Sequence, residues 1–408
     1  MALPGPGVIT GASDDDPGGI ATYSLAGART GYSLLWTSLL TLPLNAAVQN
    51  MCARIGLVTG QGLAYALRRR YPRGVLLFFV LMLFVANTAN LGADVAAVAA
   101  GLGLLTGLPN AAIVVPSGVA IALMEILVPY RIFSTYLKLL TLVLLAYVVD
   151  AFVAGPDWGA ALRATFVPSV SLNGAFLTTL VAVAGTTISP YLFFWQTSEE
   201  VEELHAKHVQ QGSEPELRRA QLDVGLGMFL ANLVFYFIVL TTASTLHPAG
   251  LRDITTARQA AEALRPLAGN EATVLFAIGF IGTGLLSVPV LAGSAAYAIA
   301  EVFDWREGLE EKPREAPQFY LVIAVSTAIG LVIAASGVGA IEALFVSAVI
   351  NGVTAPVFIG AIIAVSNDER LLGRHRNGVV SNLLGLATLL LMSAAALLML
   401  GAFLVEYL

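Results

Sequence analysis

Apolar stretches of twenty residues or so follow one another along the whole chain, and Pro, Gly or charged residues separate them. A helix needs about 20 apolar residues to cross the hydrocarbon core of a membrane. The segments between the stretches are too short for a soluble domain of ordinary size. The pattern therefore predicts an all-α polytopic membrane protein with eleven spans, centred near Ile20, Asn45, Ala89, Val119, Leu142, Ala184, Val234, Leu285, Ala328, Asn351 and Leu391.

Two of these spans are interrupted by a proline beside polar side chains. In "GASDDDPGGIATYS" (11–24) Asp16 precedes Pro17, and in "VAVAGTTISPYLFFWQ" (181–196) Ser189 precedes Pro190. One such proline could simply kink a helix, but a proline also fits the first position of a new helix, where its missing N–H costs nothing. Interrupted spans at corresponding places in two halves are typical of transporters built from inverted repeats.

This spacing predicts the organisation of the chain. We expect one transmembrane transporter domain over 1–408 that contains two inverted repeats and one additional helix. The first repeat, with helices one to five, covers 1–155, and the second, with helices six to ten, covers 172–366. The eleventh helix covers 379–405, and helices one and six are the broken ones.

The distribution of Lys and Arg predicts the orientation, because cytoplasmic loops carry most of the basic residues in membrane proteins. If the N-terminus is cytoplasmic, the outer loops hold only Arg29, Arg163, Arg252, Arg258 and Arg265. The loops on the cytoplasmic side then carry Arg68, Arg69, Arg70, Arg73, Arg131, Lys207, Arg218, Arg219, Arg306, Lys312, Arg314, Arg370, Arg374 and Arg376. The first span has no basic leader or cleavage site before it, so we expect it to be retained.

The composition argues against several classes of function. Hydrophobic residues make up 57% of the chain and charged residues only 12%, with a net charge of -6 and no basic stripe that could follow a nucleic acid. The single cysteine, Cys52, excludes a disulfide framework and a thiolate cluster. All four histidines lie in loops, so a metal-dependent intramembrane enzyme lacks ligands. We expect neither enzymatic activity nor a resident cofactor.

The first interruption predicts a cation site. An ionisable residue within a span costs roughly 2.5–3.5 kcal/mol on insertion scales, so Asp16 is a functional candidate by default. A half-helix that ends there exposes unpaired carbonyl oxygens with partial negative charge. At the second interruption, the carbonyls near Thr186 and the hydroxyl of Ser189 add further oxygen donors. Oxygen ligands of this kind favour Mg²⁺, Ca²⁺ or Mn²⁺.

The roles of two further groups of residues remain open at this point. Asp14 and Asp15 could bind the waters of an ion, or they could only line the approach to it. His205 and His208, beside several glutamates, have the spacing of metal ligands on a helix, but a solvated, charged helix end is the simpler interpretation.

These residues resemble the NRAMP divalent-metal transporter family, whose members have the leucine-transporter-type fold. The family's Asp-Pro-Gly-Asn motif of helix one corresponds to Asp16-Pro17-Gly18-Gly19. Its Ala-Thr-Ile-Met-Pro-His motif of helix six corresponds to Thr186-Thr187-Ile188-Ser189-Pro190-Tyr191. The resemblance implies that Asp16 binds metal, while Gly19 replaces the family's asparagine ligand, Thr186 its alanine carbonyl donor and Ser189 its methionine.

The resemblance also implies that a proton pathway has been lost. Asp94 keeps the aspartate of helix three, but Ala97 stands where the family has a glutamate, and Tyr191 stands where it has a histidine. No arginine occurs over 318–368, where helix nine of the family has one. The glutamine of helix ten corresponds to Ala348, and Asn351 and Thr354, on about the same face, could replace it or only pack.

These departures are similar to those of the NRAMP-related magnesium transporters, a bacterial branch with "DDDP" and a "TTISPY"-like stretch. The resemblance implies a multi-pass protein of the bacterial inner membrane, expected as a monomer, that imports Mg²⁺, and also Mn²⁺, as a uniporter. Mg²⁺ loses its water reluctantly, so the ion is expected to be partly hydrated.

Two other carriers remain as alternatives. A proton-coupled Mn²⁺/Fe²⁺ importer of the parent type would be expected to keep the methionine, the histidine and the acid at 97. A sodium-coupled amino-acid carrier of the same fold would hold a substrate carboxylate, which three neighbouring aspartates would repel.

Overall fold

A computed structural model describes residues 5–127, 142–208, 210–309 and 311–407, and it contains helices but no strand in this part of the chain. In the first half of the chain, the helices are α1 (Pro6–Asp14), α2 (Pro17–Thr30), η1 (Gly31–Leu34), α3 (Leu35–Thr59), α4 (Leu63–Arg70), α5 (Arg73–Thr106), α6 (Asn110–Leu127), η2 (Leu142–Leu144), α8 (Leu145–Val153), α9 (Trp158–Phe166), α10 (Gly174–Thr187) and α11 (Pro190–Ala206). The later helices are α12 (Glu214–Thr245), α13 (Ala257–Ala261), η3 (Glu262–Leu264), α14 (Arg265–Ala268), η4 (Gly269–Glu271), α15 (Ala272–Phe303), α16 (Pro317–Ala334), α17 (Ala340–Ser366), α18 (Glu369–Leu372), η5 (Gly373–His375) and α19 (Val379–Tyr407).

The predicted spans correspond to helices in the structure. A helix covers ten of the eleven predicted centres, and the eleventh centre, Leu142, begins η2. The half of that span before Leu142 lies outside the described residues. By length and apolar composition alone, seven helical segments of the described chain could cross a membrane. The all-α membrane fold predicted from the apolar pattern is therefore confirmed.

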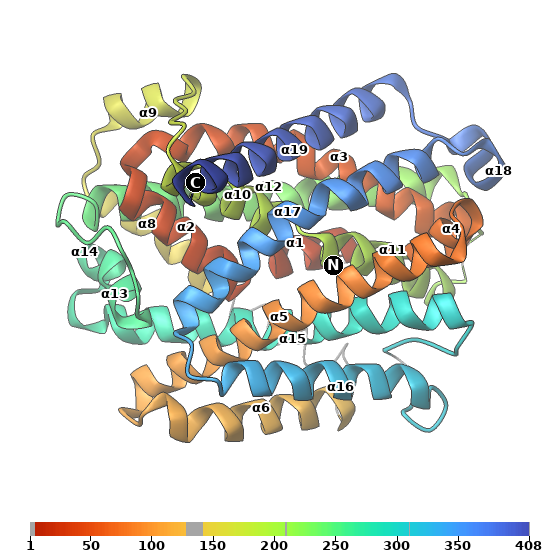
Figure 1. Cartoon of the computed structure of the whole chain (residues 1–408), viewed down its shortest axis with the longest axis horizontal. Helices are drawn as coiled ribbons and strands as arrows, with labels where there is room; N and C mark the ends of the chain where they lie inside the picture. The colour runs from red at the N-terminus through yellow and green to blue at the C-terminus, as the bar shows by residue number, and fades with distance from the viewer. Residues whose placement is uncertain (1–4, 128–141, 209, 310, 408) are drawn as a thin grey trace.

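Both predicted helix breaks are present. α1 ends at Asp14 and α2 begins at Pro17, while α10 ends at Thr187 and α11 begins at Pro190. α1 packs against α11, and α2 packs against α10. In Figure 1, α2 and α10 lie toward one end of the bundle and α11 toward the other, so the two broken helices run in opposite directions. This arrangement brings the two breaks together.

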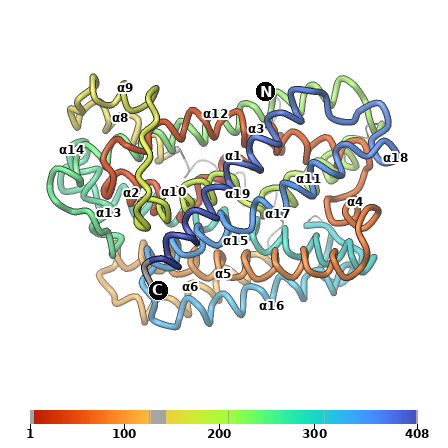
Figure 2. Tube along the Cα trace, turned by 45° about the horizontal axis from the view of Figure 1, so that its top comes forward, coloured from red at the N-terminus to blue at the C-terminus, as the bar shows by residue number. Residues whose placement is uncertain are grey.

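The helices differ strongly in how much of their surface they bury. Within the most apolar window of each segment, 83% is buried for α10 and α11 together, but only 33% for α16 and 28% for α19. Both views place α6 and α16 along one side of the bundle, with α5 and α15 between them and the broken helices (Figures 1 and 2). The breaks are therefore enclosed by other helices, while α16 and α19 present apolar side chains outward, where lipid can solvate them.

Basic loops collect at the end of the bundle that holds α4 and α18, which we call the basic end (Figure 1). Ion pairs connect its parts: Arg70 with Asp368 at 3.0 Å, and Arg68 with Asp304 at 2.6 Å. Exposed pairs of this kind add about 0–1 kcal/mol each, so they indicate position more than stability. Arg131, which was assigned to the same side from sequence, lies outside the described residues.

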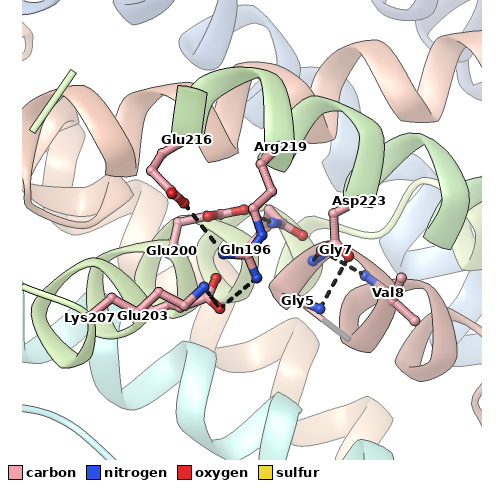
Figure 3. Close-up of polar contacts among 10 residues, drawn as sticks. All are labelled: Gly5, Gly7, Val8, Gln196, Glu200, Glu203, Lys207, Glu216, Arg219 and Asp223. Atoms are coloured by element: carbon pink, nitrogen blue, oxygen red, sulfur yellow. Dashed lines mark hydrogen bonds and ion pairs between the residues drawn. The ribbon is translucent and has the colours of Figure 1, made fainter. Parts of the chain in front are cut away.

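The first half of the broken helix one is fastened to α12. The carboxylate of Asp223 accepts hydrogen bonds from the backbone N–H groups of Gly5 (3.1 Å), Gly7 (2.7 Å) and Val8 (3.3 Å), as Figure 3 shows. These are N–H groups that a helix start leaves without partners, and a negative charge there is also favoured by the helix dipole. Asp223 therefore supplies from another helix the cap that α1 lacks in its own sequence.

Glycines allow α1 and α12 to touch along their backbones. A Cβ atom on Gly227 would lie 2.1 Å from the carbonyl oxygen of Gly7, and one on Gly11 would lie 2.3 Å from the carbonyl oxygen of Gly227. Neither distance is compatible with a real side chain. The docking of α1 on α12 therefore depends on glycine at these positions.

Candidate functional site

Asp16 lies at the start of α2 and caps it. Its backbone is extended (φ -68°, ψ 172°), and its carboxylate Oδ1 accepts a 2.6 Å hydrogen bond from the backbone N–H of Gly19. A Cβ atom on Gly18 would lie 2.9 Å from that same Oδ1. The Pro-Gly-Gly sequence after Asp16 thus opens the helix and leaves room for the carboxylate to fold back over its first turn.

Two side chains from other helices hold the second oxygen of Asp16. Oδ2 accepts from Asn90 Nδ2 of α5 at 3.2 Å and from the hydroxyl of Tyr191 of α11 at 3.3 Å. The Tyr191 hydroxyl also lies 3.0 Å from the carbonyl oxygen of Ser13, so it bridges the two broken helices. Both donors would favour a charged Asp16.

The position of Gly19 is crowded. A Cβ atom there would lie 3.2 Å from the carbonyl oxygen of Asp14 and 3.2 Å from Cε2 of Tyr23. The Tyr23 ring therefore occupies the neighbourhood that an asparagine side chain would need. Gly19 therefore does not leave an empty space of the size of an asparagine side chain.

At the second break, the polar groups are engaged within the protein. The hydroxyl of Ser189 donates to the carbonyl oxygens of Gly185 (2.7 Å) and Thr186 (2.9 Å). Asn45 Nδ2 of α3 donates to the carbonyl oxygen of Thr187 at 2.8 Å. These bonds satisfy carbonyls that the end of α10 would otherwise leave unpaired. A donating hydroxyl still has oxygen lone pairs, so these bonds leave Ser189 able to coordinate an ion.

Buried oxygens without partners lie around the first break. Asp14 Oδ1, Asp15 Oδ1 and Asn45 Oδ1 are buried and receive no hydrogen bond from any residue that the structure describes. Asp14 and Asp15 are 1% and 5% exposed, and Asp14 Oδ2 receives a long hydrogen bond, 3.5 Å, from Asn45 Nδ2. Leaving a buried polar group without a partner costs about 1–3 kcal/mol, and more for a charge. These oxygens are therefore available to a cation or to its waters.

The acidic side chains do not form a ready-made chelating cluster. In the described part of the chain, no three His, Cys, Asp or Glu side chains come together closely enough to hold one metal ion. His205 lies in the last turn of α11, beside Glu202 and Glu203. An ion at the first break would therefore combine one or two carboxylates with amide oxygens, carbonyls and its own waters.

Of the residues that the resemblance assigned to a lost proton pathway, Tyr191 bonds to Asp16, whereas Asp94 and Ala97 of α5 do not form an acidic pair. Asp94 Oδ2 accepts a 2.5 Å hydrogen bond from Ser287 of α15, while its Oδ1 has no donor among the described residues. Ala97 is buried in an apolar cluster with Ile20 and Phe280. In the region we describe, Asp94 therefore has a hydroxyl partner instead of a second acid.

On α17, Ser347 reaches the site, whereas the candidates from sequence on this helix were Asn351 and Thr354. The hydroxyl of Ser347 donates to Asn90 Oδ1 at 2.6 Å and so supports the amide that holds Asp16. The carbonyl of Ala348 packs against Gly185 of α10. Asn351 is buried one helical turn beyond Ser347, and the Thr354 hydroxyl bonds back to the carbonyl of Ile350 at 2.9 Å.

Sequence reasoning missed the amides that organise the site. Asn90 and Asn45 lie in the middle of apolar spans, Asn90 four residues before Asp94. Polar side chains inside a span are expensive, and that cost was a usable signal for both. Their partners could not be named, because they come from other helices.

All three aspartates, Thr186 and Ser189 are at most 5% exposed, so the breaks are closed to solvent in this conformation. An enclosed site with acidic side chains and backbone oxygens from two broken helices suits a small cation. It does not suit an anion, which the carboxylates would repel.

Comparison with known proteins agrees with this chemistry. The sequence model of the family described as natural resistance-associated macrophage protein-like matches residues 7–402. A divalent metal cation transporter, MntH, of Mesorhizobium japonicum is 31% identical over 309 residues, which are 74% of this chain and 68% of the relative. A second MntH, from Granulibacter bethesdensis, is 28% identical over 98% of this chain and 87% of its own length.

Solved structures show the same fold. A crystal structure of the Eremococcus coleocola manganese transporter matches with a TM-score of 0.77 and 18% identity, over 96% of this chain and 85% of its own. MhsT in complex with L-phenylalanine matches with a TM-score of 0.62 and 14% identity, over 97% and 98% of the two chains. The match extends over nearly the whole chain in both cases.

Proposed function

The chain belongs to the NRAMP family, and on that premise we propose that it is a secondary carrier for divalent metal cations and not an enzyme. The observation that carries the proposal is the enclosed group of acidic and amide oxygens at the first break, three of which have no donor among the described residues. Relatives named as divalent metal cation transporters support the same substrate class. Transport would proceed by alternating access, with one group of helices rocking against the other around Asp16.

Within this class we propose Mg²⁺ as the main substrate, with Mn²⁺ as a second. The breaks contain no sulfur and no imidazole, and hard oxygen donors are what Mg²⁺ prefers. The donors present are too few for a fully dehydrated ion, and Mg²⁺ usually keeps several waters. Mn²⁺ as the main substrate is the alternative, favoured by the structural match to a manganese transporter.

We propose further that the carrier works as a uniporter. Asp94 is bonded to a serine, and its helix has Ala97 where a proton relay would need a second acid. The proposed topology keeps the basic end in the cytoplasm of a bacterial inner membrane, with inverted repeats over 1–155 and 172–366. We propose a monomer without a resident cofactor, whose partners are the transported ion and the lipid bilayer.

Uptake into proteoliposomes tests this function. Mg²⁺, Mn²⁺ and Ca²⁺ are offered separately to the purified protein, with a fluorescent ion indicator and a pH indicator inside the vesicles. We expect Mg²⁺ and Mn²⁺ to enter without acidification of the lumen. Entry of Mn²⁺ but not Mg²⁺, accompanied by acidification, would replace our proposal with the proton-coupled manganese importer.

Replacing Ser189 by methionine should move selectivity toward softer ions. The thioether adds a soft ligand beside the break, so we expect Cd²⁺ uptake to rise relative to Mg²⁺ uptake by roughly tenfold. Ser189→Ala is the matched control, because it removes the hydroxyl bonds to Gly185 and Thr186 without adding sulfur. Equal Cd²⁺ preference in the two variants would show that loss of the hydroxyl, and not ligand softness, sets the choice.

A further inference from the structure

A second group of carboxylates lies at the basic end, away from the helix breaks. A cavity of about 380 Å³ lies between α4, α11, α15 and the loop after α15. Its lining includes four acids, Glu202, Glu301, Asp304 and Glu307, together with His205 and Tyr297. Neither lysine nor arginine is among the described residues that line it. The cavity is therefore strongly acidic although the surrounding loops are basic.

Two of these acids are partly satisfied by the protein. Glu202 Oε1 accepts hydrogen bonds from the Tyr297 hydroxyl and from the backbone N–H of Leu309, the latter at 2.9 Å. Asp304 pairs with Arg68 at 2.6 Å. Glu202 is therefore held in place and Asp304 is neutralised, which leaves Glu301 and Glu307 as the acids that need an explanation.

Glu301 has one oxygen that serves the fold and one that does not. Oε2 accepts a 2.7 Å hydrogen bond from the backbone N–H of Tyr65, in the first turn of α4, whose own N-cap residue is Gly62. Oε1 is buried and accepts no hydrogen bond of normal geometry from the described residues, and the whole side chain is only 7% exposed. A Cβ atom on Gly62 would lie 1.6 Å from this Oε1. Glycine at 62 therefore permits the carboxylate to lie in the cavity wall.

Glu307, in the loop after α15, also lines the cavity with an oxygen that is unpartnered among the described residues. Its Oε2 is buried and also has no hydrogen-bond donor in the part of the chain that the structure describes. Removing a carboxylate from water without a partner is costly, so the cavity must take up either protons or a cation to neutralise these groups.

We propose that this cavity binds a divalent cation through Glu301 and Glu307, as a second site separate from the one at the helix breaks. Since no three acidic side chains converge on one point in the described chain, the ion keeps part of its water shell. The volume is sufficient, because a water molecule takes up about 30 Å³. Mg²⁺ is commonly held in this way, through one or two carboxylates and several waters.

Binding to the full-length protein in detergent tests the proposal, with Mn²⁺ as a paramagnetic probe. The measurements use an Asp16→Ala background, so that the site at the breaks does not contribute and the result does not depend on transport. Electron paramagnetic resonance of free Mn²⁺ should show one saturable ion per chain, displaced by Mg²⁺. Adding Glu301→Gln and Glu307→Gln together should weaken this binding by about tenfold or more.

Two controls keep the test decisive. Glu369→Gln changes an exposed acid of the basic end that pairs with Arg376 and does not line the cavity, so it should leave Mn²⁺ affinity unchanged. If the double variant does not fold, the fluorescence of Trp305, which lines the cavity, reports Mn²⁺ binding instead. Mn²⁺ should quench a fluorescence component that Trp305→Phe removes. The absence of saturable Mn²⁺ in the Asp16→Ala protein, or of this quenching, would show that only protons neutralise the cavity.

Discussion

Replacing Asp16 by alanine should reduce divalent-cation transport by at least about a hundredfold. Removing a residue that only orients a metal ligand typically weakens metal binding by roughly 10–100-fold, and loss of a ligand itself should exceed this range. The carboxylate is also the point at which Asn90, Tyr191 and Gly19 converge. Its removal takes away the acceptor of the Asn90 amide and of the Gly19 N–H, while the Tyr191 hydroxyl keeps the carbonyl of Ser13. Initial rates of Mg²⁺ and Mn²⁺ uptake into proteoliposomes measure the effect.

Asp16→Asn is the matched control for this experiment. Asparagine caps a helix as well as aspartate does, so this variant keeps the start of α2 while removing the charge, whereas alanine also loses about 1 kcal/mol of capping. If the charge binds the ion, both variants should lose transport. Asp16→Asn keeps the cap but faces an amide donor toward Asn90 Nδ2, so it should lose less thermal stability than Asp16→Ala. Native uptake rates in Asp16→Asn would show that the ion binds elsewhere.

Replacing Gly227 by alanine should release α1 from α12 and open the site toward the basic end. The new Cβ would lie 2.1 Å from the backbone carbonyl oxygen of Gly7, and a backbone atom cannot move aside as a side chain can. Overpacking of this kind typically costs 1–3 kcal/mol, which corresponds to a shift of about 5–150-fold in a conformational equilibrium. We expect the closed conformation to lose population and transport to fall accordingly.

Gly225→Ala is the control, because a Cβ atom at that position of the same helix would meet nothing within 4 Å. Both substitutions raise helix propensity equally. Opening is measured with Ser13→Cys in a Cys52→Ala background, since Ser13 is 1% exposed in the closed structure and Cys52 is the only native cysteine. A membrane-impermeant thiol reagent should modify the introduced thiol faster in the Gly227→Ala protein than in the Gly225→Ala protein. Equal rates would mean that α1 stays docked.

The apolar pattern and the prolines determined the framework of this protein. The spans could be predicted because the hydrocarbon core imposes a length on each apolar stretch, independently of neighbouring helices. The breaks at Pro17 and Pro190 could be predicted because a missing N–H and a fixed φ act within a few residues. Asp16 was identifiable as a candidate because an acid inside a span is costly unless it has a use.

The tertiary structure decided which partner each polar group binds. The hydroxyl of Ser189, a candidate ion ligand from sequence, donates to the carbonyls of Gly185 and Thr186 at the end of α10, and only the structure shows these partners. On α17, packing brings Ser347, which was not a candidate from sequence, into contact with Asn90. Glu125 lies near the end of α6, yet it is only 6% exposed, and its carboxylate accepts a 2.9 Å hydrogen bond from Thr327 of α16.

The sequence by itself therefore determined the membrane helices, the two breaks, the family and the acid at the centre. Only the tertiary structure decided which amides hold that acid, which glycines let α1 touch α12, and which glutamates share a cavity at the basic end. The physical reason is the distance along the sequence over which each effect acts. Apolar length, proline and charge act within one helix, whereas Ser347 and Asn90, which support Asp16 together, are 257 positions apart and meet only when the helices pack.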